Sequence, residues 1–257
     1  MNTIGTIVGL QGPVNCLERL CADRDMYRRF HMALPHLLVA LDAGDGRTTF
    51  TRFFARNAVQ HQLRHFGGMD TFLEFTLTGE MAQMHSVFQQ IRDCAVYTNE
   101  YEGIIALDIG ALTNYINEAQ VPYFLEQVKR CGACATIVFY IPRTPSRNLS
   151  LLVSKLHGCL EDLIDLKTEP YTAEELAQIA VLELEKRGVH IQDARQFHGE
   201  LTRVMTARQV KTATESCRTV LSVLKWADLS GFTPTVNVAK LRRAFAAELN
   251  QTGRELN

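Results

Sequence analysis

The sequence lacks any long apolar run, and no segment approaches the about 18 consecutive apolar residues that a membrane-spanning helix needs. Its first residues, MNTIGTIVGLQGPVN, lack a cationic region followed by a long apolar one, so no signal peptide is expected. The sequence also lacks an excess of one charge, because it has 27 basic and 28 acidic residues. These absences predict a cytoplasmic protein with no membrane contact and no overall attraction to nucleic acid.

The sequence also lacks the cysteine spacing of a disulfide framework or a zinc site. Its seven cysteines are an odd number at scattered positions, and we expect them to be small, partly buried apolar residues. Cys131 and Cys134 are half of a zinc site without a second pair, and His61 and His65 lack an acidic third ligand. No repeat and no Pro/Gly/Ser-rich linker is present, although 257 residues can form one large domain or two smaller ones.

The first part of the chain alternates apolar runs with helical patterns. The expected strands lie at residues 37–41, 72–77, 103–107 and 135–141. The expected helices lie at residues 48–65, 81–98 and 115–130. Strands that alternate with helices predict βαβ units and a mainly parallel sheet that is covered on both faces.

From about Pro170 onward the patterns are helical. Thr172 is followed by Glu174 and Glu175, which is typical of an N-cap with acidic residues in the first helical turn, and this helix ends near Arg187. Further helical patterns cover residues 193–204, 207–226 and 235–250, with no convincing strand among them. We therefore predict an α/β domain over residues 1–168 and a small all-helical domain over residues 169–257.

A glycine-containing turn joins the first expected strand to its helix. Gly44 and Gly46 would let the chain turn tightly, so that backbone amides at the helix start could surround a phosphate. Gly46-Arg47-Thr48 matches the end of a Walker A loop, G-x-x-x-x-G-K-S/T, with arginine in place of lysine and Leu41 in place of the first glycine. Taken alone, the pattern fits phosphate binding and an ordinary strand-turn-helix connection equally well.

Five segments, in order and in spacing, resemble those of the AAA+ ATPases, and in particular the bacterial branch that contains stage V sporulation protein K. They are residues 7–10 for the adenine, 41–55 for the Walker A loop and its helix, 103–108 for Walker B, 169–176 for the entry to a helical lid, and 206–208 for the sensor-2 arginine. The resemblance covers nearly the full chain. It implies a P-loop NTPase fold, with a parallel-sheet domain followed by a helical lid domain.

The same resemblance implies a site for ATP or ADP with Mg²⁺. The residues implied for the nucleotide are Ile7, Val8, Gly9, Leu10, Gly44, Asp45, Gly46, Arg47, Thr48, Thr49 and Arg208. Thr48 and Asp108 would hold Mg²⁺. The resemblance further implies an oligomer, formed with copies of this chain or with another AAA+ subunit, in which Lys155 and Asp108 would be the catalytic charges.

The hydrolytic residues depart from the family pattern at four places. Arg47 replaces the lysine, and its planar fork cannot enter the same slot. Ile109 replaces the glutamate that activates water, and residues 139–144, FYIPRT, lack the sensor-1 Thr-Asn. Lys155 stands where an arginine finger is usual. We therefore predict a nucleotide-binding module with weak or lost ATP hydrolysis.

Two alternatives stay open on the sequence. If Arg47 fills the phosphate slot, the chain is a scaffold or interaction subunit of AAA+ origin that no longer binds nucleotide. In the other alternative the chain is an active ATPase whose glutamate comes from an unrecognised position or from a neighbouring subunit.

Overall fold

The computed structural model describes residues 7–30, 32–61, 63, 72–97, 103–112, 120–225 and 233–252. Contacts between residues divide the chain into two compact units. The first unit comprises Met1–Ala43 and Arg47–Glu169, and the second comprises Gly44–Gly46 and Pro170–Asn257. The tripeptide in the turn after the first strand therefore groups with the C-terminal part of the chain.

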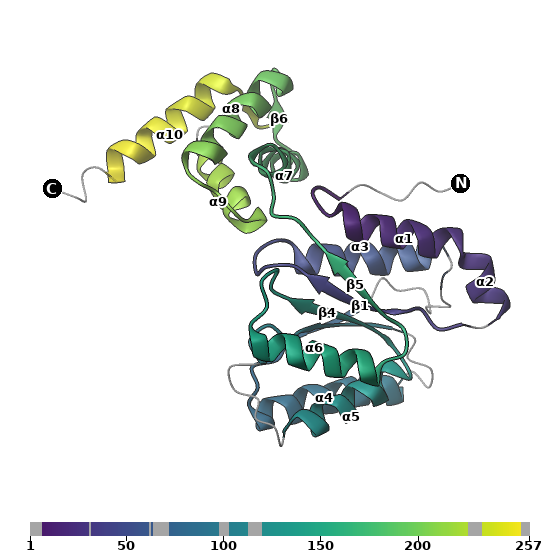
Figure 1. Ribbon diagram of the computed structural model, residues 1–257. Coiled ribbons are helices and arrows are strands. Elements are labelled where there is room, and N and C mark those ends of the chain that lie inside the picture. The colour runs from purple at the N-terminus through teal and green to yellow at the C-terminus, as the bar shows by residue number, and fades with distance from the viewer. Residues whose placement is uncertain are drawn as a thin grey trace. The chain divides into compact units, whose positions relative to one another are not determined.

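A five-stranded sheet forms the centre of the first unit (Figure 1). Its strands are β1 (His36–Ala40), β2 (Phe72–Thr76), β3 (Ile104–Asp108), β4 (Thr136–Ile141) and β5 (Leu163–Lys167). They lie in the order β2-β3-β4-β1-β5, and every pair of neighbours is parallel. The predicted α/β class with a parallel sheet is confirmed. Strand β5 was not predicted, because most of its residues are exposed and its apolar pattern is weak.

Helices cover both faces of this sheet (Figure 1). Helix α1 (Gln11–Ala22), which is followed by the short α2 (Arg24–Arg29), lies on the same face as α3 (Arg47–Gln60). Helices α4 (Met81–Tyr97), α5 (Gln120–Gly132) and α6 (Arg147–Cys159) lie side by side on the other face. A layer of helices on each side of a parallel sheet is the arrangement that the alternating sequence pattern predicts.

The largest apolar core lies between the sheet and helices α4, α5 and α6. Alternate side chains of the strands, such as Leu107 on β3 and Phe139 on β4, are fully buried there. Phe88 from α4 and Phe124 from α5 pack in the same core with their rings 6.2 Å apart. Because successive residues of a strand point to opposite faces, the intervening side chains face the α3 side of the sheet.

The second unit contains helices α7 (Ala173–Lys186), α8 (Ala194–Ala207), α9 (Ala213–Leu224) and α10 (Val238–Thr252). Its buried apolar residues form one core of their own, which includes Leu176, Phe197 and Val220. The predicted N-cap at Thr172 is confirmed, because its side chain and that of Glu175 form a capping box. The prediction that this part contains no strand is wrong: β6 (His190–Ile191) and β7 (Thr235–Val236) pair in parallel, and two residues are too few to show a periodic pattern.

No helix within the described residues is long and apolar enough to cross a membrane.

The substitution Phe124→Ala tests whether the core under α4, α5 and α6 carries the stability of the first unit. Phe124 is fully buried, so removing its ring should lower the free energy of unfolding by about 3–5 kcal/mol. Leu151→Ala on α6 is the control, because Leu151 is 57% exposed and its loss should cost at most about 0.5 kcal/mol. Urea denaturation followed by circular dichroism measures both, and equal shifts of the two midpoints would contradict this placement of the core.

Candidate functional site

The turn after β1 leads directly into the first residue of α3. The Leu41 amide still donates to the Ile141 carbonyl at 2.8 Å, so the chain leaves the sheet only after this residue. Gly44 and Gly46 then have φ values of +91° and +92°, which glycine adopts without steric cost. Helix α3 begins at the next residue, Arg47. Two left-handed glycines followed at once by a helix N-terminus are the backbone arrangement that the sequence predicts for this segment.

The side chain of Arg47 connects this turn to strand β3. Its Nε donates to the Leu41 carbonyl at 2.9 Å, and its Nη1 forms an ion pair with Oδ2 of Asp108. The pair is largely shielded from solvent, with side-chain exposures of 13% for the arginine and 21% for the aspartate. The second carboxylate oxygen of Asp108 accepts the Gly110 amide at 3.0 Å. Both oxygens of the predicted magnesium residue therefore already have partners.

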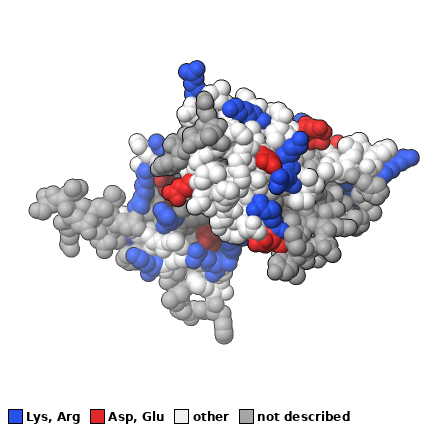
Figure 2. All heavy atoms as spheres, turned by 90° about the horizontal axis from the view of Figure 1, so that it is seen from below, with Lys and Arg blue, Asp and Glu red and all other residues white. Residues whose placement is uncertain are grey.

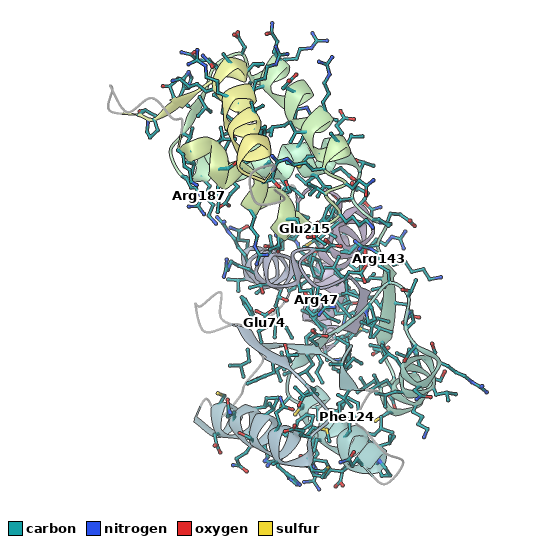
Figure 3. All side chains as sticks on the ribbon, turned by 90° about the vertical axis from the view of Figure 1, so that its left-hand side faces the viewer. Arg47, Glu74, Phe124, Arg143, Arg187 and Glu215 are labelled. Carbon is teal, nitrogen blue, oxygen red and sulfur yellow. The ribbon has the colours of Figure 1, made fainter. Side chains whose placement is uncertain are left out.

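The hydroxyl of Thr48 lies against a carboxylate that the sequence pattern does not single out. It donates to Oε1 of Glu74 on β2 at 2.8 Å. Glu74 lies beside Ala106 in the β2–β3 register, two residues before the position opposite Asp108, so both carboxylates lie on the α3 face of the sheet. Figure 3 shows Arg47 and Glu74 on one side of the strands and Phe124 on the other.

Tyr140 anchors the start of α3 to strand β4. Its hydroxyl donates to the Arg47 carbonyl at 2.9 Å and lies 2.6 Å from the Thr51 hydroxyl. Burial raises the pKa of Tyr140, and the hydrogen bond from Thr51 offsets this in part. The phenol therefore stays protonated as a donor, and it holds the first turn of α3 in place next to the glycine turn.

The departures from the hydrolytic pattern have structural counterparts. Ile109, where a glutamate would follow Asp108, is fully buried in the core on the α4–α6 side. Arg143, in the segment that lacks the sensor-1 Thr-Asn, donates to Oδ2 of Asp42 at 2.9 Å and to the Glu169 carbonyl at 3.0 Å. Lys155 is exposed on α6. The hydrogen bonds of Arg47, Thr48 and Asp108 described above go to other groups than these three side chains.

The other predicted nucleotide residues of the first unit lie before α1 and in the first turn of α3. Gly9 has a φ of +72°, and the buried Leu10 is the N-cap residue of α1. Ile7 and Val8 are partly buried. Thr49 is exposed in the first turn of α3.

The predicted residues Asp45 and Arg208 both contact residues of the second unit. Asp45 is buried, its carbonyl accepts the Tyr171 hydroxyl at 2.9 Å, and its carboxylate lies 3.4 Å from the Ala213 amide at the start of α9. A negative charge is favoured at a helix N-terminus. Arg208 follows the end of α8 and places its guanidinium 4.4 Å from the centre of the Phe245 ring.

The cysteine pair that is half of a zinc motif does not form a metal site among the described residues, where no group of three His, Cys, Asp or Glu side chains converges. Burial raises the pKa of Cys131 to about 12, so this thiol stays protonated, and Cys134 directs its Sγ to the Cys131 carbonyl. His65 of the predicted histidine pair lies outside the described residues.

The charged side chains on the face drawn in Figure 2 form separate groups. Lys and Arg side chains lie in several small groups on this face, with Asp and Glu side chains near some of them.

Comparisons with known proteins find the fold but no sequence relative. No protein-family model matches the chain, and no curated protein matches it. Among solved structures, single-substitution variants of RuvB from Thermotoga maritima, an AAA+ ATPase, superpose with a TM-score of 0.58 at 16% identity and 0.60 at 15% identity. These superpositions cover 93% and 94% of this chain and 70% of each RuvB chain. The chain therefore has the AAA+ P-loop NTPase fold, with its parallel sheet followed by a helical C-terminal region.

Proposed function

We propose that this protein is a nucleotide-binding AAA+ module that hydrolyses ATP slowly or not at all and works within a cytoplasmic oligomer. On the five sequence segments described above, we infer that it resembles the branch that contains stage V sporulation protein K. The observation that carries the proposal is the turn between β1 and α3, in which two left-handed glycines precede a helix start and an exposed threonine hydroxyl.

The residues present fit a phosphate group and a magnesium ion. The amides at the start of α3 are unsatisfied within the helix, and the helix dipole favours an anion there. The Thr48 hydroxyl and the carboxylates of Glu74 and Asp108 supply the hard oxygen atoms that Mg²⁺ prefers. When bound, Mg²⁺ neutralises charge on the β- and γ-phosphates. Arg47 would then hold the phosphates as the cation of the loop, in the place of the usual lysine.

For Arg47 to bind the phosphates, its side chain must release at least one of its present hydrogen-bond partners. In the structure its guanidinium is held by the Leu41 carbonyl and by Asp108. Hydrogen bonds to charged groups contribute about 1.5–3 kcal/mol each, so releasing one would weaken nucleotide binding by about 10- to 150-fold unless the phosphates replace it. Because phosphate oxygens accept two parallel donors from a guanidinium, they can replace what Arg47 gives up.

The contacts of the Arg47 side chain with Leu41 and Asp108 favour a second candidate function. A guanidinium that is permanently bound to Leu41 and Asp108 would occupy the loop, and the chain would then act as an interaction subunit without nucleotide. The two functions differ in one respect that can be measured, namely whether removing the arginine side chain weakens nucleotide binding or permits it.

Slow hydrolysis follows from the groups around the site. A P-loop site without assistance turns over at about 0.01 per second or slower, because a residue must orient the attacking water and a cation must stabilise the transferred phosphate. Ile109 cannot orient water from inside the core. Lys155 is exposed on α6 and offers a point charge without the two-pronged donor of an arginine.

The variant Arg47→Ala distinguishes the two candidate functions. If Arg47 binds phosphate, its removal should weaken Mg²⁺-ATP binding at least about tenfold, since a charged hydrogen bond is lost. Isothermal titration calorimetry measures the affinity, and Arg52→Ala is the control because Arg52 is exposed on the same helix. Tighter binding by Arg47→Ala than by the wild type would support the interaction subunit instead.

The variant Ile109→Glu tests the origin of slow hydrolysis. Full burial shifts a carboxyl pKa by 3–5 units, and each unit is 1.36 kcal/mol, so we expect unfolding to become easier by about 4 kcal/mol or more. Ile109→Val, which should cost about 0.5–1.5 kcal/mol, is the control for loss of volume. We expect no gain of ATP turnover in a phosphate-release assay. A stable Ile109→Glu protein that turns over several ATP per second would show that this position reaches the site.

The variant Lys155→Glu tests the oligomer. Head-to-tail contacts that close on themselves produce rings, and reversal of a contact charge should lower the assembled fraction. Light scattering across a concentration series, with and without ATP, measures the mass, and Lys129→Glu on α5 is the control because Lys129 is also exposed. A strict monomer under every condition, for the wild type and both variants, would contradict the oligomeric part of the proposal.

A further inference from the structure

The carboxylate that lies against the Thr48 hydroxyl belongs to Glu74, on the strand next to the one that carries Asp108. A threonine hydroxyl has one hydrogen to donate and two lone pairs to offer. In the structure the hydrogen points to Oε1 of Glu74 at 2.8 Å, which leaves the lone pairs for a cation. Glu74 thus holds Thr48 in the orientation that a magnesium ligand needs.

Asp108 forms no hydrogen bond with the Thr48 hydroxyl in the part of the chain that the structure describes, so it does not orient this group. Its Oδ2 is paired with Arg47 and its Oδ1 accepts the Gly110 amide at 3.0 Å. Before nucleotide binds, the positive charge of Arg47 neutralises the aspartate, so one negative charge remains among Arg47, Asp108 and Glu74 to attract an arriving Mg²⁺ ion. That charge is on Glu74, which is exposed and forms no ion pair with any residue that the structure describes.

We propose that Glu74, rather than Asp108, is the positioning carboxylate of the magnesium site: it orients the Thr48 hydroxyl and supplies the negative charge that attracts the ion. This inference rests on the proposed nucleotide binding at the same loop. Mg²⁺ keeps several of its waters and is held by one or two carboxylates together with phosphates. Partners that orient a metal ligand in this way affect metal affinity by about 10- to 100-fold.

The test is the Mg²⁺ dependence of nucleotide binding by the full chain, measured as the ratio of Kd values for a fluorescent ATP analogue in EDTA and in millimolar Mg²⁺. We expect the wild type to bind more tightly with Mg²⁺. Glu74→Gln keeps the shape of the side chain but removes its charge, and should reduce the ratio by about 10- to 100-fold. Its affinity in EDTA should stay at the wild-type value or increase, because a negative charge near the phosphates is gone.

Three further variants separate a role in metal binding from a general effect on the fold. Glu74→Asp keeps the charge, so its ratio of Kd values should lie between those of Glu74→Gln and the wild type. Asp108→Asn releases Arg47 and should change the affinity in both buffers, yet keep the Mg²⁺ ratio. Glu80→Gln, an exposed carboxylate just before α4, should behave as the wild type does.

The possible outcomes have distinct meanings. If the ratio of Kd values in EDTA and in Mg²⁺ falls in Asp108→Asn but keeps its wild-type value in Glu74→Gln, the inference is wrong and Asp108 is the carboxylate of the metal site. A wild type that binds the analogue equally with and without Mg²⁺ would overturn it as well, while leaving nucleotide binding intact. Absence of binding by every variant in both buffers would instead refute the proposed function, and this inference with it.

Discussion

Arg47 connects three parts of the first unit that are distant in sequence. Its backbone begins α3 and accepts the Tyr140 hydroxyl from β4, while its side chain reaches the Leu41 carbonyl after β1 and Asp108 on β3. The guanidinium makes both side-chain contacts at once because its donors lie in a rigid planar fork, whereas a lysine offers its donors from one point charge. The arginine therefore stabilises the loop without a ligand, and it also places a cation next to the turn where phosphates would lie.

The alternation of side chains across the parallel sheet separates this site from the core. Asp108 and Tyr140 occupy one row of the register on the α3 face, with Glu74 close by on the edge strand. Their neighbours Leu107 and Phe139 enter the core on the opposite face. Ile109 follows the same rule, since it is buried on the core side. Ile109 therefore contributes its side chain to the packing of the core rather than to the α3 face of the sheet.

Much of the fold can be predicted from the sequence, because most strands are short apolar runs and the helix starts carry their own signals. The N-cap at Thr172 is of this kind. Strand β5 and the short pair of β6 with β7 are missed because exposed or two-residue strands have no periodicity. The glycine turn is also visible in the sequence, but Glu74 is not. In the sequence, a carboxylate on an edge strand cannot be told from any other exposed acidic residue. Its position near Asp108 and Thr48 is known only from the strand register and the contacts of α3.

The measurement that tests the proposed site most directly is a crystal structure of the protein grown with a non-hydrolysable ATP analogue and Mg²⁺ at millimolar concentration. The proposed function predicts phosphate oxygens against the amides at the start of α3, with the Arg47 guanidinium turned from Asp108 to the phosphates. It also predicts Mg²⁺ at the Thr48 hydroxyl. A structure in which Arg47 keeps both its contacts, to Leu41 and to Asp108, and in which no analogue is bound at the loop, would contradict nucleotide binding and identify the chain as an interaction subunit.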